Sequence, residues 1–187
     1  MNIIAFGATT SKKSINKSLA TFASSLIAEA RVEILDLNEY ELPLFSEDKE
    51  AEIGQPQAAK DFLEKIRSAD GIIVSFAEHN GSYAAAYKNL VDWASRIEQR
   101  VYQDKPAVFL ATSPGAGGAS AVLSSAKTSA PFFGADLQDT VSVPSFYDVF
   151  DADSKAISDS TIVKQLQAAM DTLAVKAGNC EPDGQRQ

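Results

Sequence analysis

Residues 71–93 read GIIVSFAEHNGSYAAAYKNLVDW, and this stretch sets the pattern for the chain. Its first six residues are almost entirely apolar, which predicts a strand buried on both faces. A polar loop follows, and an amphipathic pattern then predicts a helix over residues 83–98. A doubly buried strand that leads through a polar loop into a helix is the repeating unit of parallel α/β sheets.

The same alternation of short strands and longer helices extends in both directions. Further strands are expected at Asn2–Phe6, Val32–Leu37, Ala107–Thr112 and Leu137–Val143, and further helices at 15–30, 57–68, 119–132 and 155–177. Because each crossover between parallel strands is right-handed, the helices must cover both faces of the sheet. We therefore predict an α/β three-layer sandwich with a five-stranded parallel sheet. Residues 1–177 should form a single domain, and the polar residues 178–187 a disordered C-terminal tail.

Composition excludes several classes of function. The 187 residues include 17 Lys and Arg against 25 Asp and Glu, a formal charge of −8, which argues against nucleic acid as a partner. No apolar run approaches the roughly 20 residues that cross a membrane, so we expect a cytoplasmic protein with no membrane partner. Cys180 is the only cysteine and His79 the only histidine, which excludes an internal disulfide and Cys- or His-rich metal sites.

The loop after the first strand reads GATTSKKSIN, residues 7–16, and is rich in hydroxyl groups and lysine. A helix N-terminus binds anions through its unpaired N–H groups, so this loop is a candidate phosphate site. The alternative is that Ser14 only caps the helix and the rest is a polar turn. Neither GxxxxGK[ST] nor GxGxxG is present, which disfavours NTP hydrolysis and a standard NAD-binding half.

Four segments together resemble one known family. Residues 77–93 resemble the PEYNxSxPxxLKNxxDW signature of the NAD(P)H-dependent FMN reductases, which are flavodoxin-like proteins that bind FMN. The GATTSKKSIN loop is similar to the family's GSxxxxSxN phosphate loop. Two less specific matches are YELPLF at 40–45 and the glycine-rich SPGAGGA at 113–119. The resemblance spans residues 1 to about 135 and implies a flavodoxin-like fold.

The resemblance also implies which residues bind the cofactor, and it implies no catalytic side chain. The FMN phosphate is expected at Thr9, Ser11, Ser14 and Asn16. The isoalloxazine ring is expected against Glu78, His79, Asn80, Gly81 and Ser82, and its pyrimidine edge against Ser113, Gly115, Gly117 and Gly118. Glycines in these loops let backbone N–H groups approach a flat ring without obstruction by a Cβ atom.

The chain departs from the family pattern at several positions. Ala77 replaces the proline that opens the signature, His79 replaces its tyrosine, and Ala84 and Ala85 replace a later Pro-Gly pair. The first loop lacks the family's frequent arginine, whose charge Lys12 or Lys13 could supply. These departures bear on pocket width and flavin affinity, and they leave open whether FMN is a prosthetic group or a substrate.

The function that the resemblance implies is an FMN-dependent oxidoreductase. NADPH or NADH would deliver hydride to the flavin N5 atom, and a small-molecule acceptor such as free flavin or a quinone would take the electrons. The family also implies a homodimer or homotetramer. Two alternatives stay open from the sequence: a non-catalytic flavodoxin-type electron carrier, and a phosphate-binding regulatory module without redox function.

Overall fold

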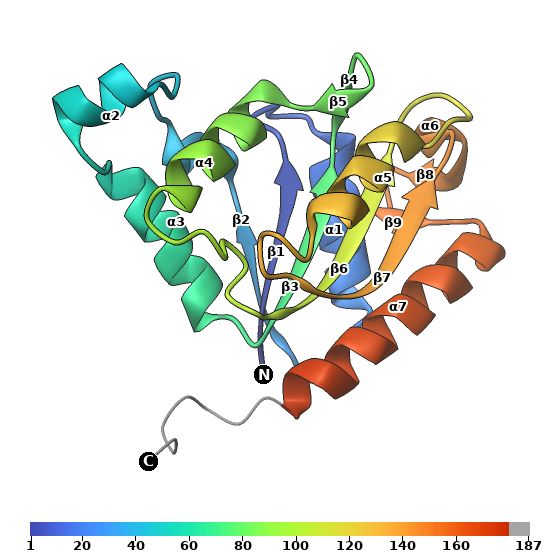
Figure 1. Cartoon of the computed structure of the whole chain (residues 1–187). Coiled ribbons are helices and arrows are strands. Elements are labelled where there is room, and N and C mark those ends of the chain that lie inside the picture. The colour runs from blue at the N-terminus through green and yellow to red at the C-terminus, as the bar shows by residue number, and fades with distance from the viewer. Residues whose placement is uncertain (180–187) are drawn as a thin grey trace.

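The computed structural model describes residues 1–179, which form an α/β sandwich around one parallel sheet (Figure 1). The sheet has five strands in the order β2-β1-β3-β6-β7. They are β1 (Asn2–Ala8), β2 (Arg31–Leu35), β3 (Gly71–Phe76), β6 (Pro106–Thr112) and β7 (Asp136–Val143). The parallel five-stranded sheet is therefore confirmed, and its order is that of flavodoxin-like folds.

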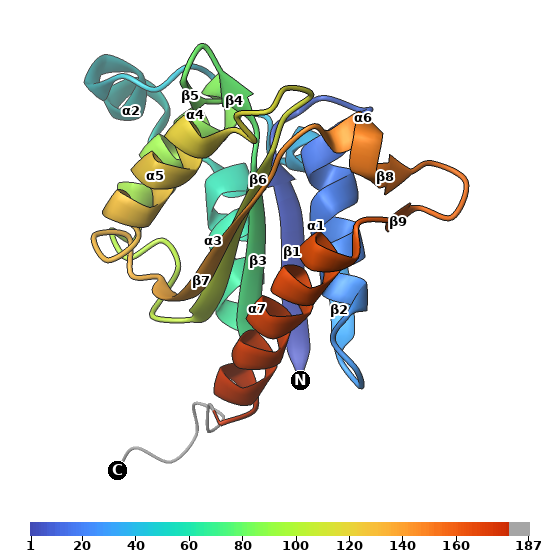
Figure 2. The ribbon, with the colours of Figure 1, turned by 90° about the vertical axis from the view of Figure 1, so that its right-hand side faces the viewer.

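Helices cover both faces of the sheet, as predicted (Figure 2). One face carries α1 (Ile15–Ser25) and α7 (Ser160–Gly178), and the other carries α3 (Gln57–Ser68), α4 (Ala85–Ser95) and α5 (Ser120–Ser129). Each face has its own hydrophobic core. Every residue of β3 and β6 is buried, which explains why these strands read as almost entirely apolar runs.

Several short elements were not predicted. They are the 3₁₀ helix η1 (Leu37–Tyr40), α2 (Glu47–Ile53), the hairpin of β4 (Glu78–His79) and β5 (Ser82–Tyr83), α6 (Phe146–Val149), and the hairpin of β8 (Phe150–Asp151) and β9 (Ala156–Ile157). The two hairpins and α6 lie at or near the carboxyl end of the sheet (Figures 1 and 2).

The predicted helices 83–98 and 119–132 are shorter in the structure, as α4 and α5, and two others differ from their predictions by five residues at one end. The helix expected over 15–30 ends at Ser25, where the side chains of Ser24 and Ser25 donate to backbone carbonyls three residues earlier. The helix expected from residue 155 begins at Ser160, because Asp159 caps it by accepting from two backbone N–H groups.

The C-terminal boundary also differs from the prediction. Gly178 is the last residue of α7 and does not belong to a tail. The rest of the predicted tail from residue 180 on, with Cys180, lies outside the described residues. Within residues 1–179 none of the helices combines the length and apolar character that crossing a membrane requires.

Close packing of α1 on β1 sets the start of the first loop. A Cβ atom on Gly7 would lie 2.6 Å from the backbone nitrogen of Lys17, so only glycine fits there. The N-terminus of α1 is thereby held at the carboxyl end of the sheet, where ligands bind in folds of this class.

Candidate functional site

The loops that follow β1, β3 and β6 enclose a cavity of about 190 Å³ at the carboxyl end of the sheet. Seven predicted site residues line it: Thr9, Ser11, Ser14, Asn16, Glu78, His79 and Ser113. Six do not line it: Asn80, Gly81, Ser82, Gly115, Gly117 and Gly118. The structure thus brings together the three loops expected from the resemblance, although residues separated by about 100 positions must meet to do so.

The β1–α1 loop offers a set of hydrogen-bond donors. Ser14 is the N-cap of α1, and its Oγ accepts from Lys17 N at 3.1 Å. The first N–H groups of a helix have no acceptor within the helix, so those of Ile15 and Asn16 remain available to a ligand. The hydroxyls of Thr9 and Ser11 lie 3.3 Å apart beside them, and Lys13 also lines the cavity. Hydroxyls, helix N–H groups and one ammonium are donors that fit a phosphate.

The side chain of Asn16 is engaged within the protein, although the residue lines the cavity. Its Nδ2 donates to the carbonyl of Thr112 at 3.1 Å, and its Oδ1 accepts from Thr112 N at 3.0 Å and from Ser75 Oγ at 2.8 Å. All three residues are buried. The side chain therefore ties the start of α1 to the ends of β3 and β6, and it positions the β1–α1 loop against the other two loops.

The loop after β3 is a tight hairpin. Asn80 and Gly81 form its tip with φ angles of 52° and 74°, a pair of left-handed residues as in a type I′ turn. With Ser82 they are exposed and do not line the cavity, and the hairpin projects at the carboxyl end of the sheet (Figure 1). His79 lines the cavity and is exposed.

Glu78 connects the β4–β5 hairpin to helix α5, which follows the glycine-rich loop. Its carboxylate accepts from Val122 N at 2.9 Å, in the first turn of α5. The N-cap of that helix, Ala119, has no side chain that could do this. Glu78 thus caps α5 from a distant part of the chain and fixes the end of the glycine-rich loop.

The three glycines of the loop after β6 are not equivalent. A Cβ atom on Gly115 or Gly117 would meet nothing within 4 Å, so open space lies above their backbone. A Cβ atom on Gly118 would lie 2.3 Å from Ser142 Oγ, and its φ of 57° is left-handed. Gly115 and Gly117 can therefore accept a ligand over their backbone, whereas Gly118 serves packing against β7.

The later part of the signature holds the segment that matches YELPLF. Asn89 Oδ1 accepts from Phe45 N at 2.8 Å, and its Nδ2 donates to the carbonyl of Pro43 at 3.0 Å. Trp93 is buried, and its Nε1 donates to the same carbonyl at 2.8 Å. Two motifs that lie far apart in the sequence are thus joined by hydrogen bonds.

Two residues of the cavity lie outside the four motif segments and were missed by the sequence analysis. Thr112 ends β6 and uses its hydroxyl to donate to the carbonyl of Val143 at 2.6 Å. Tyr147 comes from α6, directly after the last strand of the sheet. The rule that ligands bind at the carboxyl ends of strands could have directed attention to the loop after β7 as well.

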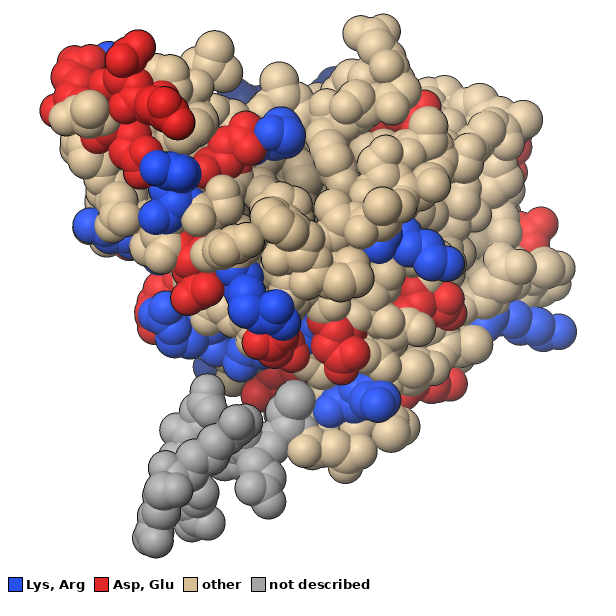
Figure 3. Space-filling model, viewed as in Figure 1, with Lys and Arg blue, Asp and Glu red and all other residues tan. Residues whose placement is uncertain are grey.

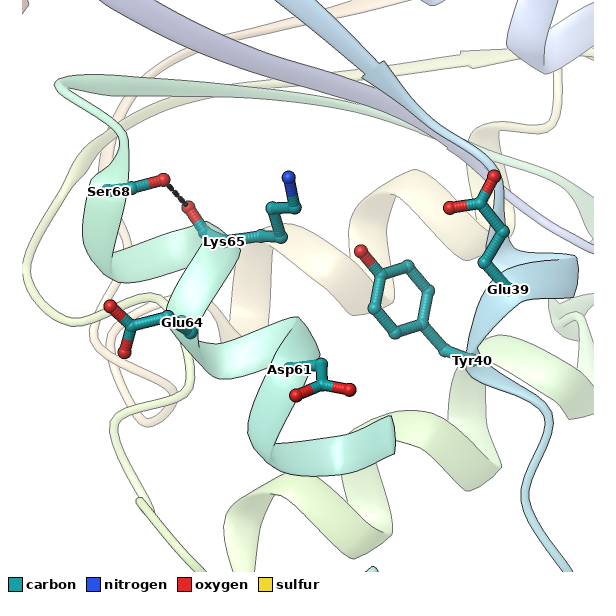
Figure 4. A pocket seen from close by; sticks show the side chains of 6 residues that line it. All are labelled: Glu39, Tyr40, Asp61, Glu64, Lys65 and Ser68. Carbon is teal, nitrogen blue, oxygen red and sulfur yellow. Dashed lines mark hydrogen bonds between the residues drawn. The ribbon is translucent and has the colours of Figure 1, made fainter. Parts of the chain in front are cut away.

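A larger hollow of about 550 Å³ lies between η1 and α3, away from these loops (Figure 4). It is lined by Glu39, Tyr40, Asp61, Glu64, Lys65 and Ser68. Burial, with the nearby carboxylates, raises the pKa of Tyr40 to about 12, so its phenol stays neutral. Three carboxylates against one amine make this hollow unsuited to a phosphate, and the smaller cavity remains the candidate site.

Comparisons with known proteins agree with this geometry. Residues 1–148 match the family described as NADPH-dependent FMN reductase. An NAD(P)H-dependent FMN reductase of Pseudomonas aeruginosa is 32% identical over 142 residues, which cover 73% of this chain and 75% of that protein. A quinone reductase of Pseudomonas putida is 38% identical over 107 residues, and the alignment spans 57% of this chain but only 54% of that relative.

Solved structures show the same architecture. FerB of Paracoccus denitrificans, a flavoenzyme NAD(P)H:(acceptor) oxidoreductase, superposes with a TM-score of 0.77 at 26% identity, over 95% of this chain and 97% of its own. The apo form of an NADH:FMN oxidoreductase, EMOB, superposes with a TM-score of 0.67 at 19% identity, over 93% of this chain and 88% of its own, which is a likeness of fold. The family match over residues 1–148, the flavodoxin-like strand order and the loops gathered at the cavity agree: this chain belongs to the NADPH-dependent FMN reductase family.

Proposed function

We propose that this protein is an FMN-dependent NAD(P)H oxidoreductase that reduces a small-molecule acceptor, with residues 1–177 acting as one FMN-binding domain. The observation that carries the proposal is the donor-lined cavity at the N-terminus of α1, enclosed by the three loops in which the family motifs lie. Relatives named as quinone reductases and as an FMN reductase support an enzyme over a non-catalytic carrier, and they favour a quinone or a flavin as acceptor.

The hydrogen-bond donors that line the cavity suggest which residues would hold the phosphate and which would lie under the ring. The phosphate would be held by the hydroxyls of Thr9, Ser11 and Ser14, by the first N–H groups of α1, and by Lys13. The cavity of about 190 Å³ is smaller than the roughly 300–1,000 Å³ of a complete ligand pocket. The ring would therefore extend out of it, over the open backbone of the glycine-rich loop.

Bound FMN supplies a ring that accepts hydride from NADPH or NADH and passes the electrons to the acceptor. The chain's own task is to bind and orient. Glu78 is engaged in capping α5, and His79 is largely exposed, so neither is placed as a buried acid or base. A ring over the open backbone of Gly115 and Gly117 would keep its other face accessible to a second flat molecule, and holding two reactants in contact can raise their effective concentration to ~10⁵ M or more.

The proposal includes a homodimer or homotetramer. The segment around α2 projects from the rest of the chain (Figure 1), and none of the residues of α2 is buried. Leu44 is 82% exposed and Ile53 45% exposed on this segment, and exposed large apolar side chains are candidates for a protein interface. Dependence on NADPH or NADH, which are intracellular reductants, supports a cytoplasmic location.

Two assays on the purified protein test the function together. One is a titration of FMN followed by its fluorescence, and the other is steady-state oxidation of NADPH and of NADH with FMN and 1,4-benzoquinone added. We expect saturable FMN binding and oxidation that depends on the acceptor. FMN binding without nicotinamide oxidation would instead identify a carrier. Absence of both would contradict the assignment.

A further inference from the structure

Tyr147 lies at the cavity although none of the four sequence motifs includes it. It is in α6, and it lines the cavity together with Thr9, Ser11 and Lys13. The side chain is 69% exposed. Figure 2 shows α6 beside the start of α1, at the end of the sheet where the loops gather.

Backbone hydrogen bonds fix α6 to the glycine-rich loop of the site. Ser145 N donates to the carbonyl of Gly115 at 3.0 Å, and Phe146 N donates to the carbonyl of Ser113 at 3.0 Å. Phe146 is buried and stacks on Phe150 with ring centroids 4.6 Å apart. The ring of Tyr147 packs edge-on against Phe146 at 5.7 Å. The backbone next to this exposed tyrosine is therefore fixed by hydrogen bonds to the glycine-rich loop, which is the loop that would contact the ligand.

The segment also contains a strained residue directly before α6. Ser145 has φ 49° and ψ 51°, a left-handed conformation that costs free energy for any residue with a Cβ atom. Such strain persists only where the surroundings impose it, and it is found preferentially at ligand sites. Here Ser158 N donates to the carbonyl of Val149 at 2.7 Å and braces the far end of α6.

The chemistry of the cavity indicates what Tyr147 would contact. The side that belongs to the β1–α1 loop consists of hydroxyls, helix N–H groups and Lys13, which together suit an anion. An apolar ring placed over these donors would leave them without partners, which is unfavourable. The phenol of Tyr147 is a further donor, and its side chain, which lines the cavity and is largely exposed, is accessible to a ligand.

We infer that the Tyr147 hydroxyl donates a hydrogen bond to the phosphate of FMN and makes the site selective for FMN over riboflavin. This inference rests on the proposed function, because it assigns one more residue to the same cofactor. Hydrogen bonds to charged groups are stronger than those between neutral groups. Loss of the phenol should therefore weaken binding of the phosphorylated flavin and leave binding of the unphosphorylated flavin unchanged.

The test compares dissociation constants of FMN and riboflavin, measured by flavin fluorescence, for the full chain and its variants. We expect Tyr147→Phe to weaken FMN binding about tenfold, which corresponds to about 1.4 kcal/mol. Its affinity for riboflavin should stay within about twofold, and Tyr147→Ala should weaken FMN binding at least as much. Phe132→Leu is the matched control, because Phe132 is also an exposed aromatic residue, at 60%, and does not line the cavity.

Each other outcome has a defined meaning. Equal weakening of FMN and riboflavin binding would overturn the phosphate contact, because Tyr147 would then contact the part of the ligand that FMN and riboflavin share. Unchanged affinities in both Tyr147 variants would remove the residue from the site. A wild-type chain that does not bind FMN would refute the proposed function and this inference with it, which distinguishes that failure from one confined to Tyr147. Circular dichroism spectra and thermal midpoints should match the wild type, because the exposed side chain contributes little to the core.

Discussion

The hydroxyl of Ser14 accepts a hydrogen bond from Lys17 N and also lines the cavity. The two interpretations of the first loop, helix cap or phosphate site, are therefore compatible. Asn16 is the opposite case: its side chain is occupied by Ser75 and Thr112, so only its backbone N–H remains for a ligand. A residue type that fits a binding motif can thus serve the architecture of the site.

A charge at position 14 separates the two roles of Ser14. Aspartate is as good an N-cap as serine and favours the helix dipole, so Ser14→Asp should keep the thermal midpoint within a few degrees of the wild type. Its carboxylate would repel the phosphate, and we expect FMN binding to fall at least tenfold. Thermal denaturation and FMN titration measure the two effects. Wild-type affinity in this variant would place the phosphate elsewhere.

Removal of the Asn16 side chain should destabilise the fold. Asn16→Ala leaves the buried Ser75 hydroxyl and Thr112 amide without partners, and we expect a loss of about 2–3 kcal/mol in the free energy of unfolding. Asn38→Ala is the control, because Asn38 is exposed. Urea denaturation of both variants provides the comparison, and equal stability of the two would contradict the role given to Asn16.

At the scale of elements, the strands were predictable and the short connections were not. β3 and β6 are buried on both faces, and their short apolar runs therefore predict buried parallel strands. α2 has no buried residue, so no apolar period marks it in the sequence. The Asn80-Gly81 pair is a strong hairpin signal and could have predicted the β4–β5 turn. The β8–β9 hairpin has strands of two residues each, too short for any alternation to be visible.

The link between α1 and the end of β2 should make stability depend on pH. Lys17 Nζ lies 2.7 Å from Asp36, and its hydrogen bond, with that of Asn38 N, lowers the pKa of Asp36 to about 2. A lowered pKa in the folded state stabilises the protein above pH ~4, and this contribution is lost as the pH falls towards 2.

Because both side chains are 35% exposed, we expect Asp36→Asn to cost only about 1 kcal/mol at pH 7. The difference from the wild type should disappear near pH 2. Urea denaturation at several pH values measures it, and a constant difference would show that the ion pair is not its source.

The glycine-rich loop gives a matched pair of variants. Gly118→Ala places a Cβ atom 2.3 Å from Ser142 Oγ at a left-handed φ, and we expect a loss of about 2–4 kcal/mol in the free energy of unfolding. Gly115→Ala meets no atom within 4 Å and should leave stability unchanged while weakening FMN binding. Denaturation and FMN titration distinguish them. If both variants lost stability equally, the open space above Gly115 would be refuted.

For the molecule as a whole, charge is distributed unevenly. The formal charge is −8, and Figure 3 shows acidic side chains gathered over α2, where Glu47, Asp48, Glu50 and Glu52 lie. The candidate site instead carries Lys13 and the positive end of α1.

Sequence motifs predicted which loops meet at the candidate site. They did not predict Tyr147, because its position depends on how α6 packs on the loop after β6.

The most direct test of the account is a crystal structure of the protein with FMN bound. We predict the phosphate within hydrogen-bonding distance of the Ser14 hydroxyl and of the backbone N–H groups of Ile15 and Asn16, with the ring over Gly115 and Gly117. A phosphate bound at any other position, such as the acidic hollow between η1 and α3, would contradict it.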